Sequence, residues 1–156
     1  MREEKKIARI LAGVAFCSLC LTVLADPGTV VQTNVVQGPV VKTTLTWASG
    51  TNNYASGDSS YYVRGTVQRV EIVPNLASFP SNAYDVTLSD ENGVDILAGL
   101  GADASSNTVS CFCPGLVCTD GGATTSMVPF VVNDIFSLLV TNCGNSRGGS
   151  VVLYLK

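Results

Sequence analysis

The sequence predicts an all-β protein, a two-sheet antiparallel β-sandwich of jelly-roll or immunoglobulin-like type with seven or eight strands, after an N-terminal signal or anchor helix. Residues 26–156 are rich in Val, Thr, Ser, Gly and Asn, which favours short strands joined by turns. They contain no long stretch with apolar side chains at helical spacing. Turn signals instead separate alternating segments about every 8 to 12 residues, as in sandwiches.

Residues 1–25 have the layout of a secretory signal peptide. Basic side chains precede an apolar run, and Val23 and Ala25 occupy the −3 and −1 positions of a cleavage site before Asp26. A retained membrane anchor is the alternative, because residues 7–25 form a stretch of 19 residues that is just long enough to cross a bilayer. Both interpretations place the rest of the chain outside the cytoplasm, either secreted, at the cell surface or in a virion.

Residues 26–38 are interpreted as an extended N-terminal arm that precedes a sandwich domain at residues 39–156. Its Val pairs favour extended backbone, polar residues interrupt the run, and Gly28 and Gly38 flank it. We expect the arm to add little to the core of its own subunit, and to pair with a neighbouring subunit or lie over an edge strand. The side chains expected to contact a partner are Val30, Val31, Val35 and Val36 in the arm and Tyr54 in a later loop.

The strands of the sandwich follow from alternating apolar and polar positions, beginning near residues 40–48. In residues 61–73 the apolar side chains change from odd to even positions, which predicts a β-bulge near Gln68 and Arg69. Residues 83–99 predict a hairpin or a tight strand connection around an acidic turn. Further strands are expected near residues 108–113, 127–132, 135–141 and 150–155, the last two being apolar on both faces and therefore central and covered.

Four cysteines follow residue 25, and three of them lie in the segment CFCPGLVC at residues 111–118. An even number of cysteines in an exported chain favours disulfides, with free buried thiols and a metal site as less favoured alternatives. A Cys-x-Cys-x4-Cys spacing in a chain without His does not match a zinc site.

The spacing of the cysteines also restricts their pairing. Cys111 and Cys113 point to one face of a predicted strand about 6.7 Å apart, which is at the outer limit for a disulfide. We therefore expect the turn signal Pro114-Gly115 to fold Cys118 back onto Cys113. Cys111 would then pair with Cys143, and the other two pairings that four cysteines allow stay open.

Composition excludes several classes of function. Residues 26–156 carry five basic and ten acidic side chains, a net charge of −5, without a basic stripe that could bind nucleic acid. The chain has no His, so a Ser-His-Asp triad cannot form within it. It also lacks a Gly-x-Ser-x-Gly motif and a phosphate-binding glycine loop. We expect no catalytic residue, no cofactor and no metal ion.

Two clusters have both a functional and a structural interpretation. Asp90, Glu91 and Asp95 could form a calcium loop or a glycosidase pair, but a solvated turn whose side chains bond their own backbone is favoured. Trp47 could join Tyr54, Tyr61 and Tyr62 in an aromatic platform for sugars. Trp47 is nevertheless in phase with the apolar face of its strand, which favours a place in the core.

Two stretches, YDVTLSDENGVDILAGLG at residues 84–101 and TNCGNSRGGSVVLYLK at residues 141–156, carry a resemblance to a known family. They resemble small, poorly characterised structural proteins encoded in tailed bacteriophage genomes, in which similar strands flank an acidic turn and an Asn-x-Gly-Asn turn. The resemblance covers roughly residues 40–156. It implies a virion-associated β-sandwich without enzymatic activity, and it carries over no catalytic or binding residue.

These observations together favour a non-enzymatic structural or interaction protein of an extracytoplasmic or virion assembly, of decoration, fibre or capsid-associated type. The expected partners are other copies of the chain or proteins of the same capsid or surface. The membrane is involved only through residues 7–25 if these are not removed. The alternative is a secreted or surface-anchored binding module that recognises glycans.

Overall fold

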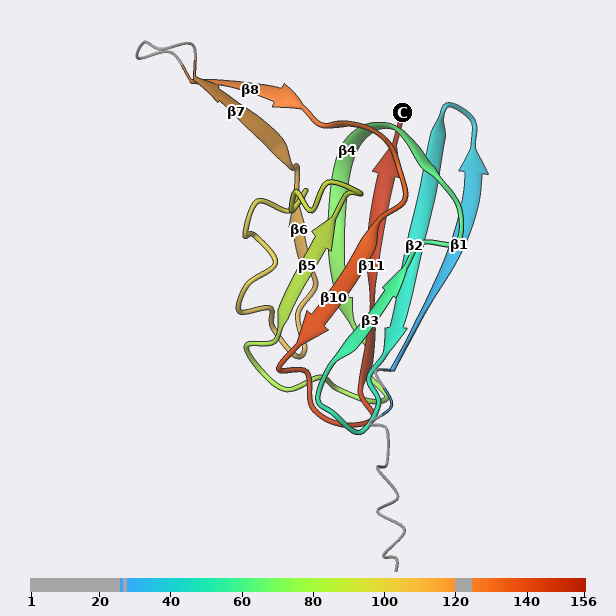
Figure 1. Ribbon diagram of the computed structural model, residues 1–156, viewed down its shortest axis with the longest axis vertical. Helices are drawn as coiled ribbons and strands as arrows, with labels where there is room; N and C mark the ends of the chain where they lie inside the picture. Colours follow the sequence, from blue (N-terminus) through green and yellow to red (C-terminus); the bar gives the residue numbers. More distant parts are fainter. Residues whose placement is uncertain (1–25, 27, 120–124) are drawn as a thin grey trace, which may run out of the picture.

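The computed structural model describes residues 26, 28–119 and 125–156, and this part of the chain is all-β (Figure 1). The predicted signal or anchor helix of residues 1–25 lies outside the described residues. The described part contains eleven strands, more than the seven or eight predicted. They are β1 (Thr29–Gln37), β2 (Val40–Ala48), β3 (Ala55–Asp58), β4 (Val63–Pro74), β5 (Asp85–Ser89), β6 (Ser110–Phe112), β7 (Gly115–Thr119), β8 (Thr125–Pro129), β9 (Val131–Asp134), β10 (Ser137–Thr141) and β11 (Gly148–Leu155).

Two antiparallel sheets make up the body of the molecule, as the sequence predicts. The larger has six strands in the order β1-β2-β11-β4-β6, with β9 also paired to β4, and the smaller has the order β3-β10-β5. β6 and β9 both lie along the side of β4 that faces away from β11, because they pair with its residues 70–72 and 63–66. A third, two-stranded sheet, β7-β8, projects from the body as a hairpin (Figure 1).

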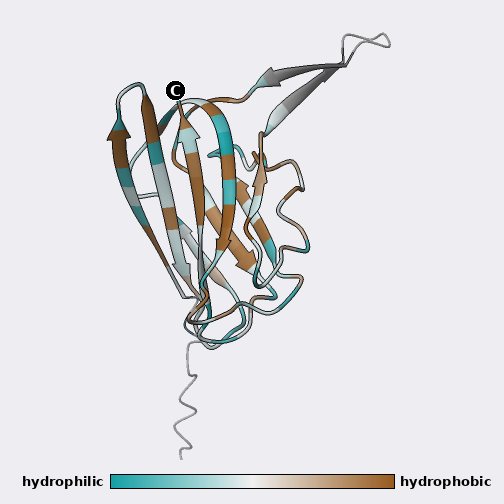
Figure 2. Ribbon diagram, turned by 180° about the vertical axis from the view of Figure 1, so that it is seen from behind, coloured by the Kyte–Doolittle hydropathy of each residue, from teal (hydrophilic) through white to brown (hydrophobic). Residues whose placement is uncertain are grey.

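The hydrophobic core lies between the two main sheets. Alternate residues of the larger sheet point inward, for example Leu45 and Trp47 in β2 and Val151 and Leu153 in β11, and all four are buried. They belong to one cluster with side chains of the smaller sheet, such as Leu138 in β10. Seen from behind, the strands of the larger sheet change along their length between hydrophobic and hydrophilic residues, as expected for a sheet with one face in water (Figure 2).

The predicted β-bulge is confirmed. Along β11, Tyr154 lies opposite Arg69 and Leu155 lies opposite Val67, so Gln68 is the extra residue in β4. The bulge restores the inward direction of the apolar side chains, since both Val67 and Val70 are buried although an odd number of positions separates them. A change of phase in the sequence was therefore sufficient to locate this irregularity.

The predicted hairpin at residues 83–99 forms only in its first half. Residues 85–89 are β5, but the return strand is reduced to a single bridge between Ser89 and Asp95. The carboxylate of Asp95 accepts hydrogen bonds from the N–H groups of Leu97 and Gly99, at 3.0 and 2.9 Å. These local bonds hold the chain in turns and compete with a strand ladder.

Residues 29–37 are extended, as predicted, but they are not a separate arm, and in this respect the structure corrects the prediction. They are β1, an edge strand of the larger sheet that pairs with β2 along its whole length, from Thr29 opposite Ala48 to Gln37 opposite Val40. The reason is the turn at Gly38-Pro39, where Gly38 adopts a positive φ of 59° and reverses the chain directly into β2. The domain therefore begins before residue 39.

The two strands expected to be covered on both faces are central but not fully covered. β10 lies in the middle of its sheet, and Leu138 and Val140 are buried, whereas Leu139 between them is 41% exposed. β11 is central in the larger sheet, and its outward residues Ser150 and Tyr154 are partly exposed. Apolar residues on both faces thus predicted correctly that each strand is central in its sheet. They did not predict that side chains on the outer face are partly exposed.

Candidate interaction surface

The open side of β1 is the most distinctive surface of the molecule. β1 has nine residues, pairs with β2 on one side and has no strand on its other side among the described residues. Its sequence, TVVQTNVVQ, contains no charged residue and no proline. Val31, Val35 and Val36 are 56%, 49% and 70% exposed. Edge strands of soluble proteins usually carry charges, prolines or bulges that prevent pairing with another chain, and β1 has none of these.

The inward-facing side chains of β1 attach the strand to the rest of the domain. The side chain of Gln32 is buried, and its Oε1 accepts a hydrogen bond of 2.8 Å from the backbone N–H of Tyr61. Val30 packs against the core at Gly57 of β3, where an added Cβ would lie 2.9 Å from the Cβ of Val30. The strand is thus attached to both main sheets, while its outer backbone edge stays open.

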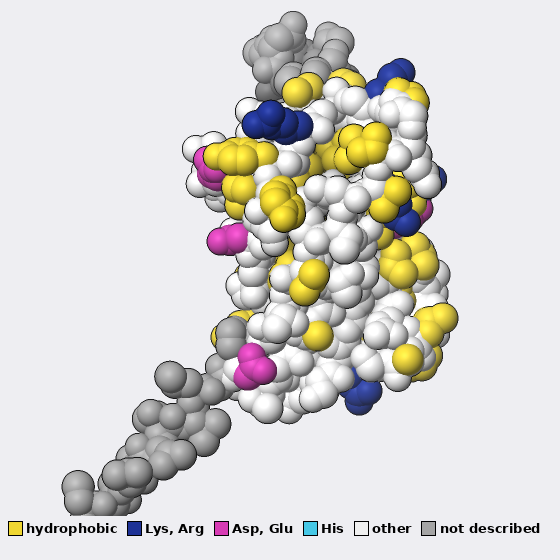
Figure 3. Space-filling model, turned by 90° about the vertical axis from the view of Figure 1, so that its right-hand side faces the viewer, with side chains coloured by type: hydrophobic (Ala, Val, Ile, Leu, Met, Phe, Trp, Pro, Cys, Tyr) yellow, Lys and Arg dark blue, Asp and Glu magenta, His cyan; other side chains and the backbone are white. Residues whose placement is uncertain are grey.

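All side chains on the outer face of β1 are uncharged. The flank of the molecule that carries β1 shows hydrophobic side chains among uncharged polar ones, with few charged groups (Figure 3). By its register with β2, Val31, Thr33 and Val35 lie in line with Thr46, Thr44 and Lys42 on the outer face of the sheet. No carboxylate of β1 or β2 is present to repel an approaching strand.

On the outer face of β11 and β4, which β2 separates from β1, the polar side chains are paired with one another. The guanidinium of Arg69 lies 4.0 Å from the ring centre of Tyr154, and the hydroxyl of Tyr154 donates a hydrogen bond of 3.1 Å to Glu71. Arg69 and Glu71 also form an ion pair of 3.2 Å. Because these groups satisfy one another, this face offers less for a partner than the open backbone of β1 does.

The residues predicted to contact a partner differ in their exposure to solvent. Val31, Val35 and Val36 are exposed on β1, whereas Val30 is partly buried against the core. Tyr54 lies before β3 and is partly buried. The sequence did not predict the hydrogen bond between Gln32 and Tyr61 that anchors the strand, and Tyr61 was expected only in the candidate aromatic platform. A polar residue between two Val pairs gave no sign that it would be buried.

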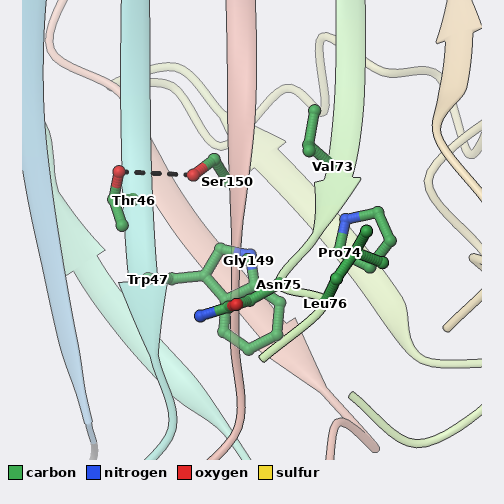
Figure 4. A pocket seen from close by; sticks show the side chains of 8 residues that line it. All are labelled: Thr46, Trp47, Val73, Pro74, Asn75, Leu76, Gly149 and Ser150. Carbon is green, nitrogen blue, oxygen red and sulfur yellow. Dashed lines mark hydrogen bonds between the residues drawn. The ribbon is translucent and has the colours of Figure 1, made fainter. Parts of the chain in front are cut away.

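A shallow hollow of about 250 Å³ lies at one end of the larger sheet (Figure 4). It opens beside Gly149, between residues of β2, β4 and β11, where the hydroxyl oxygens of Thr46 and Ser150 are 3.3 Å apart. Its lining residues are Thr46, Trp47, Val73, Pro74, Asn75, Leu76, Gly149 and Ser150. None of these is ionisable, so the hollow contains no side chain suited to acid–base catalysis.

Trp47 belongs to the core and not to a sugar-binding platform. It is 1% exposed, and its ring centre lies 5.8 Å from that of the buried Tyr84, with the ring planes tilted by 49°. Tilted aromatic pairs of this kind are typical of protein interiors. Tyr54 therefore has no exposed Trp47 beside it with which to stack on a ligand.

The acidic turn uses its carboxylates locally, as the structural interpretation predicts. Asp90 Oδ1 accepts hydrogen bonds from the N–H groups of Asn92 and Val94, at 2.9 and 2.8 Å. The carboxyl of Glu91 lies beside that of Asp134, and a hydrogen bond and the negative charge of that neighbour raise the pKa of Glu91. No group of three or more His, Cys, Asp or Glu residues in the described part could hold a metal ion.

The expected disulfides do not form among the described residues. Cys111 and Cys113 are exposed free thiols, whereas Cys143 is a free thiol that is fully buried. Burial raises the pKa of the Cys143 thiol, and its Sγ donates a hydrogen bond of 3.4 Å to the carbonyl of Asn53. Because Cys111 and Cys143 are both free thiols, the predicted Cys111–Cys143 bridge is not present in this structure.

The predicted Cys113–Cys118 bridge falls partly outside the described residues. After Pro114 the backbone does not reverse but continues as β7, in which residue 118 pairs with Ser126 of β8. An extended strand carries the chain away by about 3.3 Å per residue, so Cys118 is not folded back onto Cys113. The side chain of Cys118 lies outside the described part, and Cys113 itself is free.

Comparisons of the chain with protein-family models, with curated proteins and with solved structures found no match. Among the described residues, no helix is long and apolar enough to cross a membrane.

Proposed function

We propose that the protein is a non-enzymatic structural or interaction component of an extracytoplasmic or virion assembly, of the decoration, fibre or capsid-associated type. The observation that carries this proposal is the open edge of β1, nine residues without charge or proline. Such an edge presents unpaired backbone donors and acceptors along its length and is suited to pairing with a strand of a neighbouring subunit.

The rest of the fold is suited to a subunit of an assembly. We propose that the two main sheets form a β-sandwich whose common core keeps the edge of β1 straight and in one position. A strand that is attached through Gln32 and Val30 loses little conformational freedom when a neighbour pairs with it, and this favours association. The resemblance of residues 84–101 and 141–156 to phage structural proteins supports the same class of function.

This function is tested by fractionation of the native source. Culture fluid and cell-surface material are separated on a density gradient, the chain is detected by antibody, and its N terminus is determined by mass spectrometry. We expect the chain in a particle or surface-structure fraction, beginning at Asp26 if the signal is cleaved. A chain that is present only as free soluble protein in every fraction contradicts an assembly function.

The matched control for this experiment changes only the edge. Val31 and Val35 are exposed, so Val31→Glu combined with Val35→Glu places charge on the strand without altering the core. We expect this double variant to leave the particle fraction, whereas a double variant at exposed positions outside β1, Leu76→Glu with Leu100→Glu, stays in it.

A further inference from the structure

We infer that the strand that pairs with β1 is β1 of a second copy of this chain, antiparallel to the first, with a two-fold axis at Thr33. The inference rests on the proposed function and names its partner. This pairing joins the larger sheets of the two copies edge to edge into one continuous sheet. β1 of each copy then becomes an interior strand.

The sequence of β1 is complementary to itself about Thr33. In the antiparallel arrangement each residue lies opposite the residue equally far on the other side of Thr33. Val30 then meets Val36 of the second copy, Val31 meets its Val35, and Gln32 meets its Asn34. The valines then form aliphatic pairs, the amides lie opposite each other, and the central Thr–Thr pair is a favourable cross-strand neighbour.

The pairing also keeps the two faces of the sheet apart. Opposed residues differ by an even number of positions, so an outward residue always meets an outward one. Val31, Thr33 and Val35 of both copies form one row on the outer face, which continues the row through Thr46, Thr44 and Lys42. On the inner face, the highly exposed Val36 of one copy contacts Val30 of the other copy, the residue that packs against the core.

The absence of charge makes a second copy a suitable occupant. A two-fold axis places a strand beside a copy that carries the same charges, so a strand with several charges of one sign repels its copy. β1 has none, and the nearest basic group of β2, Lys42, lies beside Val35 and thus near Val31 of the second copy rather than near its own equivalent. Exposed Val36 loses contact with water only if the edge is covered.

Two double variants test the register. The opposite-charge variant combines Val31→Lys with Val35→Glu, and the antiparallel register then places an ammonium opposite a carboxylate of the second copy, twice per interface. The like-charge variant combines Val31→Glu with Val35→Glu, and the same register places carboxylates opposite each other. Light scattering coupled to size-exclusion chromatography is run on the exported protein from about 1 µM to 1 mM, since a one-strand interface is small. Far-UV circular dichroism checks that both variants are folded.

We expect the wild type and the opposite-charge variant to form dimers. The like-charge variant is expected to dimerise at least about tenfold more weakly, with a difference that shrinks at high salt. A wild type that stays monomeric throughout the series overturns the inference. So does a like-charge variant that dimerises as well as the opposite-charge one. If the chain is monomeric when purified but still fractionates with particles, the partner of β1 is another protein, and the proposed function stands without this inference.

Discussion

The strands β1 and β11 are similar in length and composition but differ in almost every structural respect. β1 has nine residues and β11 has eight, both contain Val and neither contains a charged residue. Six residues of β11 are buried, whereas Gln32 alone is buried in β1. β11 lies between β2 and β4 over the core, and β1 lies at the edge. Composition thus predicts that a segment is a strand, and the position in the sheet decides whether it stabilises the monomer or remains available to a partner.

The largest expected effect on stability is at the centre of β11. Leu153 is fully buried, and Leu153→Ala removes its contacts and leaves a cavity, so we expect a loss of about 2–5 kcal/mol in the free energy of unfolding. Val36→Ala in β1 is the matched control at a 70% exposed position and is expected to change stability by less than about 0.5 kcal/mol. Denaturant unfolding at concentrations where the chain is monomeric measures both. Equal losses would mean that β1 contributes as much to the monomer as β11 does.

A smaller effect is expected from Gly149→Ala in the same strand. An added Cβ would lie 2.7 Å from Cζ2 of Trp47 and 2.8 Å from the carbonyl oxygen of Val73, so the indole must move. Overpacking of this kind costs about 1–3 kcal/mol. The chain contains a single Trp, so its fluorescence emission reports the displacement directly. Ser150→Ala at the next, outward position is the control, and an unchanged emission spectrum in Gly149→Ala would show that the indole does not depend on this glycine.

The smallest effect is expected at the inner attachment of β1. Gln32→Ala removes the acceptor of the Tyr61 N–H and is expected to cost about 1 kcal/mol, because a part-buried hydrogen bond from a buried side chain is lost. Gln37→Ala, the same chemical change at an exposed position of β1, is the control. Thermal unfolding and amide hydrogen exchange of residues 29–37 measure the difference. If exchange in β1 is as slow in Gln32→Ala as in wild type, the strand is held by its pairing with β2 alone.

The order of residues was enough to predict the class of the fold and several of its details. Alternation of Val86 and Leu88 with polar residues located β5, and a change of phase located the bulge at Gln68. The apolar run before Leu155 placed β11 at the centre of a sheet. These features are local, because the pleat of a strand turns the order of residues directly into inward and outward faces.

The course of residues 29–37 and the state of the cysteines depended instead on the folded molecule. In TVVQTNVVQ the valines occur in adjacent pairs, so neither face of the strand is marked as inner, and the Gly38-Pro39 turn and the bond to Tyr61 were needed to show which side is attached. Likewise the spacing of Cys113 and Cys118 permits a bridge that an extended β7 does not form. Both depend on contacts between segments far apart in the chain. Pairing of this kind is set by the shared core and the positions of other strands, which no local pattern of residues contains.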